Sequence, residues 1–274
     1  MEKQEYKYFL DEKEDKQSDK LFFKFAIVLF VIYLVVFASA FIFRANFEYI
    51  TINGCSMQNT LNPNPVEIDN ELVQDGVYIK LTQNVNYGDI IVLNKTEEES
   101  IIKRALAFGG DYVTIASISY DGNRDYRFMR VKQGSDEVEI LNEANYIKSY
   151  DLWNMVEGEV VGDVEYETSI YLNYQGLQYN TKTFDVLLDG KEREVVFFEI
   201  PDDHVFYMGD NRTGSYDARF SGTLNKSHIE GYVVKIVHNG TLTKQNAFSS
   251  LFQQIGDFFS IIWGEISRFF GAKG

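Results

Sequence analysis

Residues 25–43 read FAIVLFVIYLVVFASAFIF and contain no charged side chain. A helix needs about 20 consecutive apolar residues to span the hydrocarbon core of a bilayer. This stretch is apolar on every side, whereas a helix at the surface of a soluble core keeps a polar face. It is also longer than the apolar core of a cleaved secretory signal, which is the competing interpretation. We therefore expect a retained transmembrane helix over residues 25–43.

Basic residues flank this stretch unequally. Six lysines precede it, whereas Arg44 is the only basic residue between it and Lys80. Because cytoplasmic flanks of membrane spans are enriched in Lys and Arg, the pattern predicts a single-pass protein of the cytoplasmic membrane. Residues 1–24 then form a cytoplasmic tail, and everything after the span lies outside.

The composition excludes several classes of function. The net charge of -15 argues against nucleic acid as a partner, because phosphate binding requires a basic surface. Cys55 is the single cysteine, so there is no internal disulfide framework and no Cys-rich metal site. Three histidines leave little material for a His-based metal site. We expect no cofactor and no metal.

The region after the span is rich in short runs of Val, Ile, Tyr and Phe separated by Gly, Asn and Asp. Such runs favour strands, and the separating residues favour turns. The fold class expected is therefore mostly β, with the transmembrane helix before it. The predicted strands are residues 48–52, 77–81, 89–93, 111–115, 126–131, 138–141, 168–174, 183–188, 194–200, 204–208 and 232–238.

The last part of the chain, residues 246–274, has a different pattern. Apolar and aromatic residues recur there at three- and four-residue steps, which predicts an amphipathic C-terminal helix with a broad aromatic face. Two interpretations compete: the helix lies on the membrane interface, or it docks onto the domain or a partner. A second span is disfavoured because Asp257 and Glu265 would lie in hydrocarbon.

Two residues outside this helix, Ser56 and Lys103, are candidates for a catalytic role. Ser56 follows the small residues Gly54 and Cys55, where a flexible backbone could expose a nucleophilic hydroxyl and nearby backbone N–H groups. Lys103 lies between apolar residues; if it points inward, burial lowers its pKa and makes it a usable base. Apolar residues flank Lys103 on both faces of the run, so periodicity leaves its direction open. An ordinary turn serine and a solvated lysine are the alternatives.

The segment 209–222, GDNRTGSYDARFSG, is too polar for a strand. Its Asp and Arg residues are spaced to form bidentate pairs that brace a loop. With three earlier segments it gives the chain a clear resemblance to bacterial type I signal peptidases, of the Gram-positive kind. The matching motifs, in order, are Ser56-Met57-x-x-Thr60-Leu61, Gly88-Asp89-Ile90, Lys103-Arg104 with Gly110-Asp111, and Gly209-Asp210-Asn211-Arg212-x-x-Ser215-x-Asp217-x-Arg219-x-x-Gly222.

The resemblance implies a serine endopeptidase with a Ser-Lys dyad that cleaves signal peptides from exported preproteins. Ser56 would be the nucleophile and Lys103 the base, with the Ser56 N–H in the oxyanion hole. Gly54 stands where many members carry a further hydroxyl donor. The other implied roles are orientation of Lys103 by Ser215, an Asp217–Arg219 pair, bracing by Asp210 and Arg212, and a substrate cleft that includes Met57 and Thr60.

The resemblance also implies an extracytoplasmic peptidase domain over residues 44–245, with an inserted β lobe at 112–200. Its partners would be signal peptides and the membrane, close to the secretion translocon. Asn59, the stretch 107–109 and Ala218 depart from the family pattern. These departures keep two alternatives open: a processing peptidase for a narrow substrate set, and an inactive signal-peptidase-like binding or scaffold protein.

Overall fold

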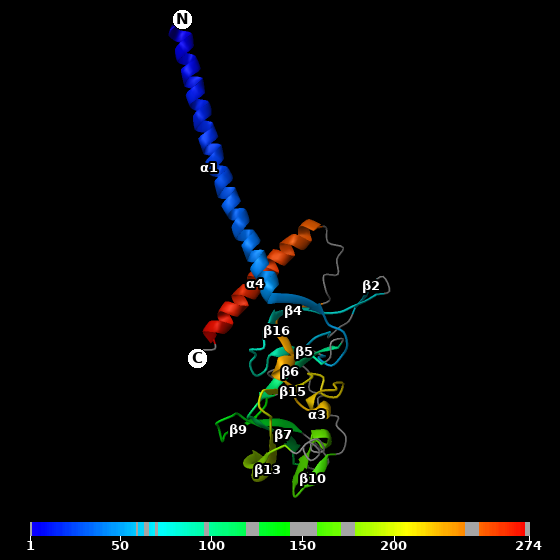
Figure 1. Ribbon diagram of the computed structural model, residues 1–274. Coiled ribbons are helices and arrows are strands. Elements are labelled where there is room, and N and C mark those ends of the chain that lie inside the picture. The colour runs from blue at the N-terminus through cyan, green and yellow to red at the C-terminus, as the bar shows by residue number, and fades with distance from the viewer. Residues whose placement is uncertain are drawn as a thin grey trace. The chain divides into compact units, whose positions relative to one another are not determined.

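The structure is a computed structural model that describes residues 2–58, 60–62, 66–68, 71–95, 99–118, 126–142, 158–170, 179–238 and 247–271. The chain divides into two compact units, Met1–Phe47 and Glu48–Gly274. Helix α1, Glu2–Asn46, makes up the first unit (Figure 1). The second unit contains two large sheets, a two-stranded sheet and a C-terminal helix.

Helix α1 contains the predicted span. Its segment Lys20–Asn46 is long and apolar enough to cross a membrane. An 18-residue window within this segment has a mean hydropathy of 2.9, and none of that window is buried within the structure. The side chains of Phe25, Phe30 and Val36 are all exposed. A helix that is apolar on every side is suited to lipid rather than to water, which is consistent with a single-pass anchor.

The first sheet is antiparallel at each pairing whose register is known. Its strands, in spatial order, are β1 (Phe47–Thr51), β4 (Gly76–Leu81), β16 (Ile229–Val237), β5 (Ile90–Asn94), β6 (Ser100–Phe108), β14 (His204–Met208) and β15 (Leu224–Asn225). Strand β6 lies inside this sheet, between β5 and β14, and the side chains from Ile102 to Ala107 are all buried. This position decides the environment of Lys103.

The second sheet is built entirely from the segment 112–199. Strand β7 pairs with β8, β11 and β13, and β9, β10 and β12 extend the sheet from these strands. The bounds are β7 Tyr112–Ser117, β8 Arg127–Val131, β9 Val138–Ile140, β10 Glu159–Val161, β11 Val164–Tyr166, β12 Thr181–Leu188 and β13 Lys191–Glu199. A separate pair is formed by β2 (Val66–Ile68) and β3 (Glu71–Val73).

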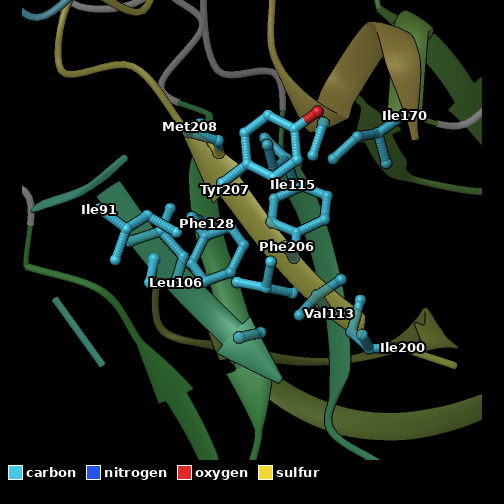
Figure 2. Close-up of a cluster of buried hydrophobic side chains, with 14 of the residues drawn as sticks. Ile91, Leu106, Val113, Ile115, Phe128, Ile170, Ile200, Phe206, Tyr207 and Met208 are labelled. Carbon is cyan, nitrogen blue, oxygen red and sulfur yellow. The ribbon is translucent and has the colours of Figure 1, made fainter. Parts of the chain in front are cut away.

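The two sheets share one hydrophobic core. Figure 2 shows Leu106 and Phe206 of the first sheet gathered with Val113 and Phe128 of the second. The rings of Phe128 and Phe206 stack with their centroids 5.7 Å apart. The segment expected to form an inserted lobe therefore has its own sheet but packs into the same compact unit as the first sheet.

The mostly β fold class is confirmed, and one predicted strand is wrong. Residues 168–170 of the expected strand 168–174 are helical, and the rest of it lies outside the described residues. The Glu167 carboxylate accepts hydrogen bonds from the N–H groups of Ser169, at 3.3 Å, and Ile170, at 2.9 Å. These bonds satisfy donors at the start of a helical turn and favour it over an extended strand.

The C-terminal helix is present as α4, Ala247–Gly271. It lies beside β16 (Figure 1). Two ion pairs, Lys235 with Asp257 and Lys80 with Glu265, join it to the first sheet. Of the two interpretations of this helix, docking onto its own domain is what the structure shows.

Candidate active site

Ser56 lies in a compact turn between β1 and β4. The Gln58 N–H donates to the Cys55 carbonyl oxygen at 3.0 Å, and the Leu61 N–H donates to that of Met57 at 2.8 Å. Gly54, just before the turn, has a φ of +95°, although a side chain there would meet no atom within 4 Å. Backbone conformation rather than space therefore favours glycine at this position.

A buried side-chain clamp holds both ends of this turn. The Asn62 N–H donates to the Asp75 carboxylate at 2.7 Å, and the Asp75 N–H donates to the Asn62 side-chain oxygen at 2.6 Å. The Asn62 amide also donates to the carbonyl oxygens of Ile52 at 3.1 Å and Gly54 at 3.2 Å. This pair, which no sequence motif marks, fixes the turn that holds Ser56 to the start of β4.

Lys103 points inward from β6, which settles the direction that periodicity left open. Its side chain is 4% exposed, and its amine lies 2.8 Å from the Ser56 hydroxyl oxygen and 3.0 Å from the Ile102 carbonyl oxygen. Alternation could not reveal this orientation, because both faces of β6 are covered. Ser56 and Lys103 come from segments far apart in sequence and meet here.

Burial lowers the pKa of the Lys103 amine from its ordinary value. The negative charge of Asp217 is the largest opposing influence and raises this pKa, with smaller contributions in the same direction from Cys55 and Glu99. Burial prevails, because a charged amine loses more hydration than these neighbours restore. Burial therefore shifts the amine toward its neutral form, which is the form that can accept a proton.

The polar loop 209–222 is braced by a fully buried ion pair. The Arg219 guanidinium donates to the two carboxylate oxygens of Asp217, at 2.8 and 3.0 Å. Asp217 also accepts the Gly209 N–H at 2.9 Å and caps the short helix α3, Ala218–Ser221. Arg219 further donates to the Arg212 carbonyl oxygen at 2.6 Å. The expected Asp217–Arg219 pair is thus formed and connects several turns of the loop.

The same loop contacts the turn that holds Ser56 directly. The Asn211 N–H donates to the Ser56 carbonyl oxygen at 3.0 Å, and the Asn211 amide donates to that of Cys55 at 3.1 Å. A side chain at Gly209 would lie 2.4 Å from the Ser56 carbonyl oxygen, so only glycine permits this approach. Asn211 belongs to the motif at residues 209–222, but the sequence does not reveal its contact with the turn that holds Ser56.

Asp210 and Arg212, both expected to brace this region, have different partners. The Arg104 guanidinium donates to the two oxygens of Asp210, at 2.8 and 2.5 Å, and the Thr60 hydroxyl donates to the same carboxylate at 2.5 Å. Arg104 also donates to the Gly88 carbonyl oxygen at 2.7 Å. Arg212 instead donates to the Gly209 carbonyl oxygen within the loop. Asp210 thereby joins three of the sequence motifs.

Two expected site residues occupy other surroundings than the sequence suggested. The Ser215 hydroxyl is buried and makes no hydrogen bond within the described part of the chain, so the expected bond to Lys103 is absent. Met57, expected in the substrate cleft, is 2% exposed and packs with Leu61 and Val77 in the core beneath the turn. Among the residues described, no group of His, Cys, Asp or Glu could hold a metal ion.

Replacing Asp217 by alanine is expected to destabilise the protein strongly, because it leaves the Arg219 charge buried and unpaired. Removing one partner of a buried ion pair costs about 3–5 kcal/mol. The matched control is Asp136→Ala, which removes the exposed pair with Lys182 and should cost about 0–1 kcal/mol. Denaturant unfolding of both variants measures the difference, and equal losses would contradict the prediction.

Comparison with known proteins identifies the family. The family model described as "Signal peptidase, peptidase S26" matches residues 23–238. The signal peptidase I of Aquifex aeolicus is 30% identical over 228 residues, which cover 79% of this chain and 86% of that protein. The signal peptidase I of Buchnera aphidicola is 24% identical over 259 residues, which cover 83% and 79%. A crystal structure of a signal peptidase I from Enterococcus faecalis matches with a TM-score of 0.27 at 16% identity, over 54% of this chain and 96% of that one. Because the family match covers most of the chain, the resemblance to bacterial type I signal peptidases is confirmed, and the protein belongs to the signal peptidase family, peptidase S26.

Proposed function

We propose that this protein is a membrane-anchored serine endopeptidase that removes N-terminal signal peptides from exported preproteins, with Ser56 as nucleophile and Lys103 as base. The observation that carries the proposal is the 2.8 Å contact between the Lys103 amine and the Ser56 hydroxyl, with the amine buried. A nucleophile and a base within hydrogen-bond reach form the minimal pair for covalent catalysis.

In the proposed reaction, neutral Lys103 accepts the Ser56 proton while the Ser56 oxygen bonds to the scissile carbonyl carbon. The lysine then donates that proton to the leaving amine as the peptide bond breaks, which leaves the signal peptide as an ester on Ser56. Lys103 next accepts a proton from water, whose oxygen bonds to the ester carbon. The bond from that carbon to the Ser56 oxygen then breaks, Lys103 returns the proton to this oxygen, and the signal peptide leaves with a free C-terminal carboxyl group. This is the Ser-Lys form of the nucleophile-and-base mechanism.

The oxyanion formed in each step needs hydrogen-bond donors. Within the described residues, the Ser56 N–H donates no hydrogen bond to the protein and is available for this role. Gly54 contributes no hydroxyl, and its φ of +95° disfavours the serine that many relatives carry at this position. We assign the first donor to the Ser56 backbone, with a second backbone group or a water completing the oxyanion hole.

Ser215 is proposed to position the Lys103 amine during turnover. Its hydroxyl is buried and has no hydrogen-bond partner in the described residues, and an ideal Cβ at Gly209 would lie 2.2 Å from it and 2.4 Å from the Ser56 carbonyl oxygen. Ser215 therefore lies close to the backbone of the nucleophile turn. Thr60 and Met57 are proposed to act on the substrate cleft indirectly, by supporting the turn that holds Ser56: Thr60 binds Asp210, and Met57 packs in the core.

The proposed topology has α1 crossing the cytoplasmic membrane once. The lysines on its N-terminal side place that end in the cytoplasm, and the catalytic domain lies outside, near the translocon. Signal peptides emerge on that side. The substrate is proposed to bind in an extended conformation with small side chains before the cleavage site. Because β1 begins at the residue after α1, the nucleophile turn follows the span by a short length of chain.

Cleavage of a preprotein in vitro tests the dyad. Ser56→Ala is expected to abolish cleavage, and Lys103→Ala should reduce it by roughly 10²–10⁴-fold, the range that a general base supplies. Lys191→Ala is the matched control, because this lysine is exposed on the second sheet. Cleavage that survives both dyad substitutions would refute the proposed mechanism.

The pH dependence of kcat/KM tests the protonation state of Lys103. Activity should rise with pH as the amine loses its proton, with a midpoint below the ordinary lysine pKa because burial lowers it. Glu99→Gln removes a charge that raises this pKa and should move the midpoint to lower pH. Lys95→Gln removes a charge that lowers it and should move the midpoint to higher pH. Shifts in the same direction, or none, would contradict the assignment.

Ser215→Ala separates positioning from stability. Because the Ser215 hydroxyl makes no hydrogen bond in the described structure, its removal should not lower the free energy of unfolding, whereas kcat should fall. Ser221→Ala is the contrasting variant, since its hydroxyl bonds Tyr207 at 3.0 Å and the Asp217 carbonyl oxygen at 3.0 Å. That change should cost about 1 kcal/mol of stability. Full activity in Ser215→Ala would remove Ser215 from the mechanism.

A further inference from the structure

Helix α4 turns its charged residues toward its own domain. Asp257 pairs with Lys235, and Glu265 pairs with Lys80 and accepts the Tyr232 hydroxyl at 2.8 Å. The Arg268 guanidinium lies 2.5 Å from Asp89 and 3.8 Å from the centroid of the Tyr232 ring. Every charged side chain between residues 256 and 271 is therefore partly buried and paired.

The opposite side of α4 is uncharged and strongly apolar. Residues three and four apart share a helix face, so Phe259, Trp263, Ile266 and Phe270 form one stripe. All are exposed, Trp263 at 71%, and Phe269 lies exposed beside them. The other exposed positions of residues 256–271 are Gly or Ser. We call Phe259, Trp263, Ile266, Phe269 and Phe270 the aromatic face.

This arrangement departs from the usual one. A helix that docks on a soluble domain buries its apolar side and presents charged side chains to water. Here the docked side carries the three charged residues together with the buried Ile261, and the aromatic face stays exposed. A contiguous exposed apolar surface of this kind marks a binding surface for protein or membrane.

The position of α4 in the domain favours the membrane. Strand β1 begins at the residue that follows α1, and it is the neighbour of β4 in the first sheet. Asp257 pairs with Lys235 of β16, which lies opposite Tyr78 of β4, and the Tyr78 ring contacts the Tyr49 ring of β1 with the centroids 5.1 Å apart. Asp257 therefore lies near the strand that is joined directly to the candidate span.

We propose that the aromatic face of α4 inserts into the interfacial region of the bilayer and forms a second attachment of the catalytic domain to the membrane. The proposal rests on the membrane anchoring by α1 proposed above. Trp and Phe are suited to this region, where an amphipathic helix lies with its apolar side about 5–10 Å below the headgroups. The scarcity of lysine in α4 is offset by Lys80 and Lys235, which neutralise its two acidic residues.

The test uses the full chain with Trp153→Phe, so that Trp263 is the single tryptophan, in vesicles of phosphatidylcholine and phosphatidylglycerol. Lipids that carry a spin label near the headgroup should quench Trp263 emission more than lipids labelled deep in the chain. Aqueous acrylamide should quench it weakly. The control replaces Trp263 by Phe and introduces Leu187→Trp, an exposed position on β12 of the second sheet, which should show the reverse.

Each other outcome overturns the proposal. Quenching of Trp263 by acrylamide to the extent of the Leu187→Trp control would mean that water covers the face. Protection from acrylamide without quenching by labelled lipid would mean that protein covers it, such as a second copy of the chain. Extraction of the whole chain by alkaline carbonate would refute the anchoring itself, whereas a retained chain with unquenched Trp263 would refute the helix proposal alone. None of these readings depends on peptidase activity.

Discussion

The burial of the Lys103 amine is the constraint on which the site depends. Withholding water from an amine lowers its pKa, because the charged form loses its hydration. Strand β6 lies between β5 and β14, its side chains from Ile102 to Ala107 are buried, and the Ser56 hydroxyl contacts the Lys103 amine. The shared core of the two sheets packs around the same strand. Fold and chemistry are therefore coupled at one side chain.

Two buried Arg–carboxylate pairs brace the loop 209–222 and keep their own charges balanced. Asp217 is held by Arg219 and Asp210 by Arg104, each through two hydrogen bonds. An unpaired Asp217 would raise the pKa of Lys103 more than the paired one does. The pairs therefore hold the loop 209–222 against the turn that contains Ser56, and burial still lowers the pKa of Lys103. Their cost in desolvation is consistent with a role in geometry rather than in stability alone.

The sequence identified the candidate site residues, but it did not reveal most of the contacts that hold them together. Motifs identified Ser56, Lys103 and the polar loop. Runs of Val, Ile, Tyr and Phe identified most strands longer than three residues. The Arg104–Asp210 pair joins positions 106 apart, and no periodic signal reports such a contact. The Asn62–Asp75 clamp depends on a turn whose backbone geometry was unknown. The direction of Lys103 and the helical turn at 168–170 were likewise decided by tertiary packing and local hydrogen bonds.

Helix α4 is another case in which the sequence does not reveal a tertiary contact. Its sequence reveals two unlike faces, but not which face the domain takes. The domain takes the side that carries the charges and Ile261, because Lys80 and Lys235 lie on adjacent strands, opposite Glu265 and Asp257 respectively. A chain with a net charge of -15 is repelled by an anionic lipid surface wherever its carboxylates face it. Pairing these two carboxylates inward removes that repulsion from the one helix whose outer side is aromatic.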